Sequence, residues 1–388
     1  MLKLLIILLI LTLPATGHLH SQPMVKFAAI GDYGRWYTEG EGLVSDMIHG
    51  WNPDFIISLG DNNYEYGADS TIDSNIGQFY HDYIYPYTGV FGTGSPVNRF
   101  FPSLGNHDWL TDSARPYLNF FTLPGNERYY DFVKGNCHFF IVDSDINEPD
   151  GITAGSVQAN WLRNGLAASN ARFKIVYFHH PPYSSGQHGN NYDMRWPFKE
   201  WGATVVLCGH EHNYERLVDS TGMTYFVNGL GGKDWRDFAV IVPESRYRFT
   251  SNYGAMLITA YNDSLNFKFY SVPDSLKDDT TFIFKPIGIE PISTVAEKFE
   301  MGQNYPNPFN PATKIRFSVV PNAKGQMSKV ELAIYDVLGR KIKELVNEEL
   351  RSGTYEVLWD ASAYASGVYF YSLSTQSVIL TRKMMLTK

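Results

Sequence analysis

Short apolar runs recur along residues 25–270, and each run ends in a cluster of Gly, Asp, Asn or His. The clearest runs are residues 27–30, 55–59, 174–178 and 204–207. Runs of four or five apolar residues are typical of strands that are buried on both faces of a sheet. Amphipathic stretches such as residues 161–168 lie between them and favour helices. The pattern predicts an α/β body whose polar loops follow the carboxyl ends of its strands.

The end of this body has a different pattern. Residues 253–270 alternate between apolar and polar positions, which predicts a closing hairpin around Asn262 and Asp263. Residues 273–279 contain turn residues, and we interpret them as a turn followed by linker.

A second region begins near Pro291, where the composition changes. Residues 304–311 read Asn-Tyr-Pro-Asn-Pro-Phe-Asn-Pro, which is too rich in proline for a helix or a central strand. Beyond them, period-two alternation in residues 329–335, 353–359 and 367–373 is typical of a small antiparallel β-sandwich. This region contains no His or Cys, so we expect no metal-ligand cluster in it.

Composition sets limits on the class of protein. The 388 residues are 44% hydrophobic and 15% aromatic, which favours an ordered, β-rich protein of two domains. The net charge of -8 argues against binding to a nucleic-acid backbone, because phosphate neutralisation requires clustered Lys and Arg. Any phosphate binding must therefore be local.

The first 17 residues predict a secretory signal peptide. Lys3 precedes an apolar run at residues 4–13, and small residues suited to cleavage follow at 14–17. A membrane anchor is the alternative, but the run is too short to cross a hydrocarbon core of about 30 Å comfortably. No other stretch is long and apolar enough, so we expect no transmembrane segment in the mature chain.

Cys137 and Cys208 are the only cysteines, and both lie in apolar, strand-like runs. Buried free thiols are the simpler interpretation. A disulfide between them remains open, because export permits oxidation without requiring it.

Five clusters of metal-binding residue types follow the apolar runs. They are Gly31-Asp32-Tyr33-Gly34, Gly60-Asp61-Asn62-Asn63-Tyr64, Gly105-Asn106-His107-Asp108, Val176-Tyr177-Phe178-His179 and Gly209-His210-Glu211-His212. Alone, Gly-Asp-x-Gly is most often only a turn, and Gly-His-x-His can be a solvated histidine pair. Together they supply hard oxygen ligands and imidazoles at successive strand ends, where loops converge on one crevice. The set predicts a metal site.

The five clusters resemble the signature blocks of the calcineurin-like metallophosphoesterases. Within them they resemble the purple acid phosphatases, especially the small type that includes tartrate-resistant acid phosphatase. The resemblance covers residues 25–270. Two features carry the narrower assignment: Gly34 stands where other members place a ligand histidine, and Tyr64 is present. The resemblance implies a four-layer α-β-β-α sandwich and a metal-dependent phosphoric ester hydrolase of the acid phosphatase type.

The resemblance also implies how seven residues hold two metal ions. It assigns Asp32, Tyr64 and His212 to one ion, Asn106, His179 and His210 to the other, and Asp61 as the bridge. A phenolate is a hard anionic donor that suits Fe(III), whereas a neutral amide and two imidazoles suit divalent Fe, Zn or Mn. Three anionic ligands leave such a pair of ions positive. An anionic phosphate is therefore attracted despite the acidic chain.

Two metal ions about 3.5–4 Å apart activate water and stabilise the entering and leaving oxygens of a displacement. We expect phosphomonoester hydrolysis by attack of a metal-bound hydroxide. His107, next to Asn106, is placed by its motif to protonate the leaving alkoxide. His188 follows His179 by nine residues, where the small purple acid phosphatases carry a second substrate-facing histidine. The alternatives are a structural role for His107 and an exposed loop position for His188.

Other residues near the clusters are interpreted as structural. His180 precedes two prolines and is expected to pack beside the ligands or support them. Asp108 is a candidate to orient His107, and Arg216 is a candidate partner of Glu215. The Gly-rich residues 228–232 lack the Lys and Ser or Thr of a P-loop, which favours close backbone packing.

The C-terminal region resembles the type A sorting domain carried by substrates of the type IX secretion system. The matching residues are 304–311, 334–340, 366–369 and 383–386. The resemblance covers residues 299–388 and implies recognition of the folded tail by the secretion machinery at the outer membrane, often followed by removal of the tail. The alternative is an ordinary β-sandwich, such as a carbohydrate-binding one.

These observations predict a signal peptide at 1–17, a metallophosphoesterase domain at 24–285, a linker at 286–298 and a β-sandwich sorting domain at 299–388. The principal hypothesis is a secreted or surface-bound phosphomonoesterase that acts on small phosphorylated substrates. A phosphodiesterase or nucleotidase of the same superfamily is the first alternative. A surface-attached binding protein with a structural metal site is the alternative from another class.

Overall fold

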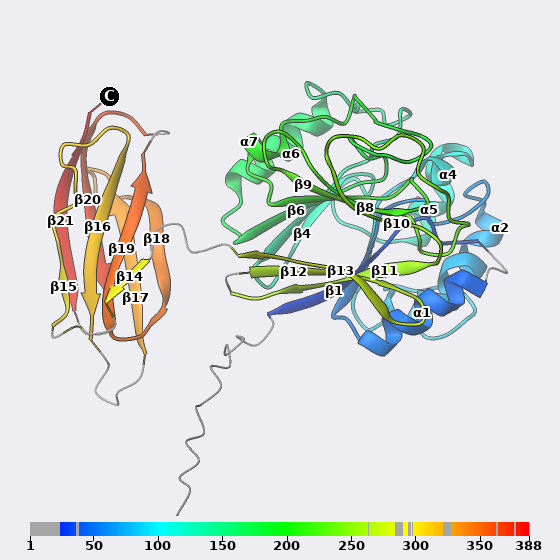
Figure 1. The fold of residues 1–388 in the computed structure, drawn as a ribbon, viewed down its shortest axis with the longest axis horizontal. Coiled ribbons are helices and arrows are strands. Elements are labelled where there is room, and N and C mark those ends of the chain that lie inside the picture. The colour runs from blue at the N-terminus through cyan, green and yellow to red at the C-terminus, as the bar shows by residue number, and fades with distance from the viewer. Residues whose placement is uncertain are drawn as a thin grey trace, which may run out of the picture. The chain divides into compact units, whose positions relative to one another are not determined.

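A computed structural model describes residues 24–35, 39–262, 264–283, 290–293, 296, 298–320, 327–361, 364–375 and 378–387. The predicted signal peptide lies outside these residues. The chain forms two compact units, Met1–Phe282 and Ile283–Lys388 (Figure 1). Within the described ranges, no helix combines the length and the apolar character needed to cross a membrane.

The first unit is built on two mixed β-sheets. The six-stranded sheet has the order β13-β12-β11-β1-β2-β3 and contains β1 (Val25–Ile30), β2 (Phe55–Ser58), β3 (Phe100–Pro102), β11 (Gly254–Ala260), β12 (Ser264–Ser271) and β13 (Ser275–Ile283). The seven-stranded sheet has the order β10-β8-β9-β7-β6-β5-β4 and contains β4 (Tyr130–Lys134), β5 (Cys137–Ile141), β6 (Phe173–Tyr177), β7 (Val205–Cys208), β8 (Tyr214–Val218), β9 (Thr224–Asn228) and β10 (Ser245–Phe249). Strands β1, β2 and β3 are parallel, as are β5, β6, β7 and β9, and antiparallel strands flank both sets.

Helices cover the outer faces of both sheets. Figure 1 shows α1 (Glu39–Trp51) on one side of the sheet pair and α6 (Val157–Ala168) and α7 (Phe198–Trp201) on the other. Shorter helices, α2 (Asp69–Ile72), α3 (Gln78–Tyr80), α4 (Asn106–Trp109) and α5 (Arg115–Phe120), lie in the connections. Helix α6 begins four residues before the predicted stretch, because the Ser156 hydroxyl caps it by accepting from Ala159 N. The α-β-β-α architecture confirms the predicted fold class.

Aromatic side chains fill the space between the two sheets. Phe139 of β5 packs edge-to-face on Phe27 of β1 and Phe55 of β2, with ring centroids 5.0 and 5.3 Å apart. Phe226 of β9 stacks on Phe267 of β12 at 4.7 Å. Such pairs each contribute about 0.5–1.5 kcal/mol beyond area burial. They fix the spacing of the sheets and so hold the loops at the strand ends beside one another.

The two cysteines are buried free thiols. Cys137 lies on β5 and Cys208 on β7, and β6 separates these strands. Strands lie about 4.8 Å apart, so the two Cα atoms are further apart than the roughly 7 Å that a disulfide can span. Burial raises the pKa of the Cys137 thiol to about 12.

Two strands lie where the sequence predicted turn or linker, and there the prediction is wrong. The turn after β12 ends at Asp274, and β13 begins at Ser275 and adds an edge to the first sheet. Strand β14 (Glu290–Ser293) falls inside the predicted linker and pairs with β19. Edge strands pack against only one neighbour and carry few apolar residues, so their sequences do not show a buried run.

The second unit consists of two antiparallel four-stranded sheets, as the period-two pattern predicted. One has the order β14-β19-β16-β15, with β15 (Glu300–Met301), β16 (Ala312–Val319) and β19 (Gly353–Asp360). The other has the order β18-β17-β20-β21, with β17 (Ser328–Tyr335), β18 (Lys341–Leu350), β20 (Gly367–Ser374) and β21 (Ile379–Leu386). Their facing sides bury a core that includes Ile315, Leu332, Val357, Trp359 and Tyr371.

Residues 302–309, here called the closing segment, run between the edges of these two sheets. Tyr305 and Lys314 of β16 exchange two backbone hydrogen bonds of 2.9 Å. Phe309 N donates to Met385 O of β21 at 3.0 Å. The Pro- and Asn-rich run therefore satisfies backbone groups on both sheets without being a regular strand.

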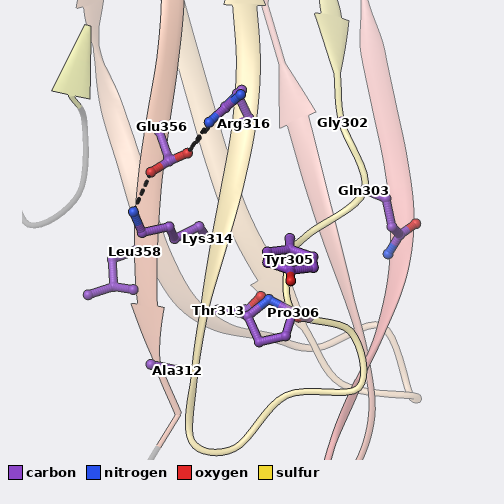
Figure 2. Close-up of a pocket in the computed structure, with 10 residues that line it drawn as sticks. All are labelled: Gly302, Gln303, Tyr305, Pro306, Ala312, Thr313, Lys314, Arg316, Glu356 and Leu358. Carbon is purple, nitrogen blue, oxygen red and sulfur yellow. Dashed lines mark hydrogen bonds and ion pairs between the residues drawn. The ribbon is translucent and has the colours of Figure 1, made fainter. Parts of the chain in front are cut away.

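A groove of about 780 Å³ runs along β16 and β19 of the second unit (Figure 2). Glu356 lies between Lys314 and Arg316, with N–O distances of 2.7 and 2.8 Å. Hydrogen bonds from Lys314 and then Arg316 hold the pKa of Glu356 below its usual range. Tyr305, which is 79% exposed, and Pro306 form another part of the wall. One carboxylate is thus shared by two cations at the centre of the groove, which leaves these three groups with a net charge of +1.

Candidate metal centre

Three of the predicted ligands sit on strained backbone directly after strands. Asp32 after β1, Asp61 after β2 and His210 after β7 have φ angles of 56°, 52° and 70°. For residues other than glycine this region costs about 1–3 kcal/mol and is concentrated at functional sites. Glycines let the loops approach: a side chain at Gly209 would lie 2.7 Å from Asp32 Oδ2. The strand ends of both sheets therefore meet at one place.

One group of donor atoms comes from Asp32, Tyr64 and His212, all of which are buried. Tyr64 Oη lies 3.0 Å from Asp32 Oδ1 and 3.4 Å from His212 Nε2. His212 Nε2 lies 3.5 Å from the same Asp32 oxygen. Because His212 Nδ1 donates to Asp234 O at 2.8 Å, its Nε2 lone pair faces the other two donors.

The other three predicted terminal ligands are Asn106, His179 and His210. His179 Nδ1 lies 2.8 Å from Leu59 O, which leaves Nε2 facing His210 Nδ1 at 3.2 Å. Asn106 begins α4, and its Oδ1 is buried without a hydrogen-bond partner among the described residues. A buried acceptor with no partner costs free energy, and a metal ion would satisfy it.

Asp61 lies between the two groups. Its Oδ2 is 2.8 Å from Tyr64 Oη and 3.3 Å from His179 Nε2. Its Oδ1 accepts from the backbone N of His107 at 2.8 Å. One carboxylate therefore contacts a member of each group and is itself fixed by the main chain.

Burial and close contact shift the pKa values of several groups in this cluster. Burial raises the pKa of Asp32 to about 7. Burial opposes a charge on His179, but Asp61 and then Asp32 outweigh it and raise the pKa of His179 to about 10. Burial lowers the pKa of His210, and His179 lowers it further. Two carboxylates, a phenol, an amide oxygen and three imidazoles facing one another are a donor set that fits hard and borderline metal ions.

Gly34 has a steric reason to be glycine. A Cβ at this position would lie 1.7 Å from Asn62 O, so no side chain fits without a backbone shift. The Gly34 carbonyl instead accepts from Tyr64 N at 2.7 Å and holds that residue in place. Tyr64 rather than residue 34 therefore supplies a donor to the cluster.

His107 and His188 lie beside the donor groups and reach solvent. The His107 ring is 4.4 Å from the Tyr64 ring, and its Nε2 is 3.9 Å from Asp61 Oδ2. The His188 ring is 4.2 Å from the His210 ring. Their side chains are 26% and 38% exposed, so a substrate in solution can reach both.

Most structural interpretations of neighbouring residues agree with the contacts. His180 Nδ1 lies 2.9 Å from Ser144 Oγ, and its ring packs on His210 at 4.4 Å. The ring nitrogens of His179, His180 and His210 also lie within 4.8 Å of one another. A Cβ at Gly229 would lie 2.8 Å from Asp32 Oδ2, so the Gly-rich loop does pack closely on the cluster.

Two suggested pairings are wrong. Asp108 accepts from Asn62 and Gly105 rather than orienting His107. Arg216 pairs with Asp278 at 2.8 Å rather than with Glu215. Arg216 on β8 meets Asp278 on β13 because the two sheets pack together, and Asp108 instead accepts at the start of its own helix and from the loop after β2.

Sequence reasoning missed three charged residues at this site. Glu211 is fully buried, and its Oε1 accepts from the backbone N of His188 and of Gly189, each at 2.9 Å. Arg236 Nη1 lies 3.0 Å from His188 Nε2. Lys233 Nζ lies 4.4 Å from the centre of the Tyr64 ring. Only Glu211 carried a local signal, because it stands between the two histidines of Gly-His-x-His.

Comparison with known families agrees with this geometry. The profile of the calcineurin-like phosphoesterases matches residues 25–214, and that of the secretion system C-terminal sorting domain matches residues 303–387. The chain therefore carries a calcineurin-like phosphoesterase domain, which defines a metal-dependent phosphoesterase, together with a sorting domain of the type IX secretion system. Its homologues place it among the purple acid phosphatase-like members.

Two curated relatives align with this chain over most of their own length. Human tartrate-resistant acid phosphatase type 5 is 26% identical in an alignment 264 residues long, which covers 58% of this chain and 78% of the human one. Purple acid phosphatase 17 of Arabidopsis thaliana is 27% identical in an alignment 252 residues long, which covers 56% of this chain and 71% of the plant one.

Two solved structures share the fold. Purple acid phosphatase PPD1 from yellow lupin (Lupinus luteus) aligns with a TM-score of 0.56 at 18% identity over 67% of this chain and 53% of the lupin chain. GAP50, the anchor in the inner membrane complex of Plasmodium, aligns with a TM-score of 0.54 at 19% identity over 68% and 90%.

Proposed function

We propose that this protein is an exported phosphomonoesterase with a two-metal centre, which releases phosphate from small organic esters. The observation that carries the proposal is the convergence of donor atoms from five loops, including the buried Asn106 Oδ1 that has no hydrogen-bond partner among the described residues. The acid phosphatase names of the homologues support the same substrate class.

The proposed division of the ligands follows the resemblance to the purple acid phosphatases. One ion is held by Asp32, Tyr64 and His212, the other by Asn106, His179 and His210, and Asp61 bridges them. Tyr64 favours Fe(III) for the first ion, and the two imidazoles favour divalent Fe, Zn or Mn for the second. When bound, such a pair supplies Lewis acidity and activates water for attack on phosphorus.

The remaining chemistry falls to histidines of the chain. His107 Nδ1 lies 2.6 Å from Glu65 O, so Nδ1 carries a hydrogen and Nε2 is turned toward Asp61 and the centre. A proton held on His107 Nε2 is available to a leaving alkoxide. His188, held beside His210, is proposed to contact the phosphoryl oxygens.

The second unit supports the cellular side of the proposal. A type IX sorting domain directs a protein to the cell surface or the medium, and we place the phosphatase there. Residues 1–17 would supply entry into the export route, and the partner of the second unit is the secretion machinery.

The test is a visible spectrum with metal analysis on the chain lacking residues 1–17, purified without chelators. We expect two metal ions per chain and a tyrosinate-to-iron charge-transfer band. Tyr64→Phe should abolish the band. Tyr66→Phe is the matched control, because Tyr66 is two residues away but 70% exposed, and it should keep the band.

Two other results would point elsewhere. A colourless protein with two divalent ions that hydrolyses bis(p-nitrophenyl) phosphate faster than p-nitrophenyl phosphate would favour the phosphodiesterase alternative. A protein without stoichiometric metal would favour the binding protein. Asp61→Ala that stays fully loaded with metal yet inactive would contradict the bridging role.

A further inference from the structure

Arg236 is tied to the proposed metal centre through its backbone. Its N donates to His212 O at 2.8 Å, and its O accepts from Thr250 Oγ1 at 3.1 Å. The main chain of Arg236 is therefore fixed to a loop that carries two of the proposed ligands. Its side chain begins from a defined place rather than from a free loop.

The guanidinium lies at Nε2 of His188, the ring nitrogen that does not face Glu211. Arg236 Nη1 is 3.0 Å from His188 Nε2. Arginine only donates, so Nε2 is the accepting nitrogen and the ring hydrogen sits on Nδ1, which is 3.3 Å from Glu211 Oε2. Arg236 therefore occupies the space that the Nε2 edge of His188 faces.

The charge of Arg236 is not met by a carboxylate. Two arginines of the first unit show such a pairing: Arg128 lies 2.9 Å from Glu148, and Arg216 lies 2.8 Å from Asp278. Among the described residues, no Asp or Glu oxygen lies within 4 Å of the Arg236 guanidinium, whose only hydrogen-bond partner there is His188. A half-buried cation that faces a neutral ring beside a phosphate site is available to an anion.

We propose that Arg236 is a substrate-binding residue that grips the transferring phosphoryl group and selects monoesters over diesters. The proposal rests on the proposed phosphatase function. On arrival of the ester, the guanidinium leaves His188 Nε2 and donates two N–H groups to phosphoryl oxygens. A monoester presents two anionic charges to this fork, whereas a diester presents one and a blocked oxygen. The same fork binds inorganic phosphate.

The experiment compares Arg236→Met and Arg236→Lys with the wild-type, metal-loaded protein. Titration calorimetry gives the Kd for inorganic phosphate, and steady-state kinetics give kcat/KM for p-nitrophenyl phosphate and bis(p-nitrophenyl) phosphate. Arg236→Met should raise the phosphate Kd and lower kcat/KM for the monoester by about 10–100-fold, as expected for a lost hydrogen bond to a charged group. The diester value should change less than about threefold, and Arg236→Lys should fall between.

Arg248→Met is the matched control. Arg248 lies on β10 of the same unit, is exposed and bonds to Ser245 Oγ at 2.7 Å, so its removal takes away the same charge from the same unit. Its phosphate Kd should match the wild type.

Three outcomes would overturn the inference. An unchanged phosphate Kd in Arg236→Met with full metal content would do so and leave the proposed function standing. So would equal losses on the monoester and the diester. A wild-type protein that binds neither metal nor phosphate would instead overturn the proposed function, and this inference with it.

Discussion

The buried carboxylate of Glu211 holds the main chain of His188. Its Oε1 accepts from the backbone N of His188 and of Gly189 at 2.9 Å, and its Oε2 lies 3.3 Å from His188 Nδ1. The loop packs closely on this carboxylate, because a Cβ at Gly186 would lie 2.2 Å from Glu211 Oε2. Glu211 also stands between His210 and His212. The loop of proposed ligands and the loop of the proposed substrate contact are therefore held as one body.

Glu211→Gln should lower turnover while leaving the metals in place. The substitution keeps the side chain's size but removes the charge that accepts from the backbone N of His188 and of Gly189, and hydrogen bonds to a charged group are worth about 1.5–3 kcal/mol. If that energy is lost from the transition state, kcat on p-nitrophenyl phosphate falls about 10–100-fold. Kinetics and metal analysis on the same preparation check it.

Glu215→Gln is the control for a merely structural effect. Glu215 is also fully buried and accepts from Ser185 N and Oγ, at 2.8 and 2.6 Å, at the start of the same loop. It should lower the melting temperature while kcat stays within about threefold of the wild type. Equal losses of kcat in both variants would show that Glu211 only stabilises the loop and does not position His188 for turnover.

Gly34→Ala should destabilise the first unit. The new Cβ would lie 1.7 Å from Asn62 O, and relief requires a shift of the loop that holds Tyr64. Overpacking of this kind costs about 1–3 kcal/mol. Gly50→Ala on α1 is the control, because an added Cβ there meets nothing within 4 Å and should stabilise by about 0.5–1 kcal/mol. Urea unfolding compares them, and equal midpoints would contradict the steric argument.

Much of this site was predictable because its signals are local. Asp32 and Asp61 each follow an apolar run directly. Strand prediction and residue type together therefore placed both at the carboxyl ends of neighbouring strands. Strands β13 and β14 gave no such signal, since edge strands need few apolar positions.

The residues that were missed depend on contacts between distant positions. Arg236 meets His188 across 48 residues, and Lys233 meets Glu65 across 168. Glu211 lay within a motif, but burial of its side chain arises only when the loop of His188 folds over it. A single sequence shows residue types and spacing, and these pairings follow from how the two sheets pack.

Asn304→Ala should destabilise the second unit without affecting catalysis. The Asn304 amide is buried and donates to Pro306 O and Thr313 Oγ1, each at 3.0 Å, which fixes the start of the closing segment. Loss of these bonds should cost about 1–3 kcal/mol. Calorimetry of the full chain should show one transition moved to lower temperature, with kcat unchanged. Movement of both transitions would mean that the two units do not unfold independently.

The His49–Asp82 pair should stabilise the first unit mainly at mildly acidic pH. His49 Nε2 lies 3.1 Å from Asp82 Oδ1, and this bond raises the pKa of His49. Burial raises the pKa of Asp82, but the bond to His49 outweighs it and the net shift is downward. The histidine contribution is complete below its unfolded pKa of about 6.5 and is lost as pH rises through the folded value. The aspartate contribution is present above about 3.9 and is lost below it.

The pair is therefore strongest between about pH 4 and 6.5. The melting temperature of His49→Gln should fall further below the wild type at about pH 5.5 than at about pH 8.5. Adding Asp82→Asn to this variant should cause little further change at either pH. A deficit of the same size at both pH values would show that packing, not charge, is what His49 supplies.

The closing segment has a consequence for the timing of folding. Asn307 Oδ1 accepts from Met385 N, and Phe309 N donates to Met385 O. These bonds cannot form until Met385, which lies 78 positions after Asn307, has been synthesised. A ribosome delivers residues 302–309 long before β21, so in a growing chain this stretch can bond to β16 but has no partner on the second sheet. Its final surface exists only on a tail that has been synthesised through β21 and folded. Secretion machinery that recognises this surface would therefore bind only chains whose second unit is fully synthesised and folded, and it would not bind unfinished chains.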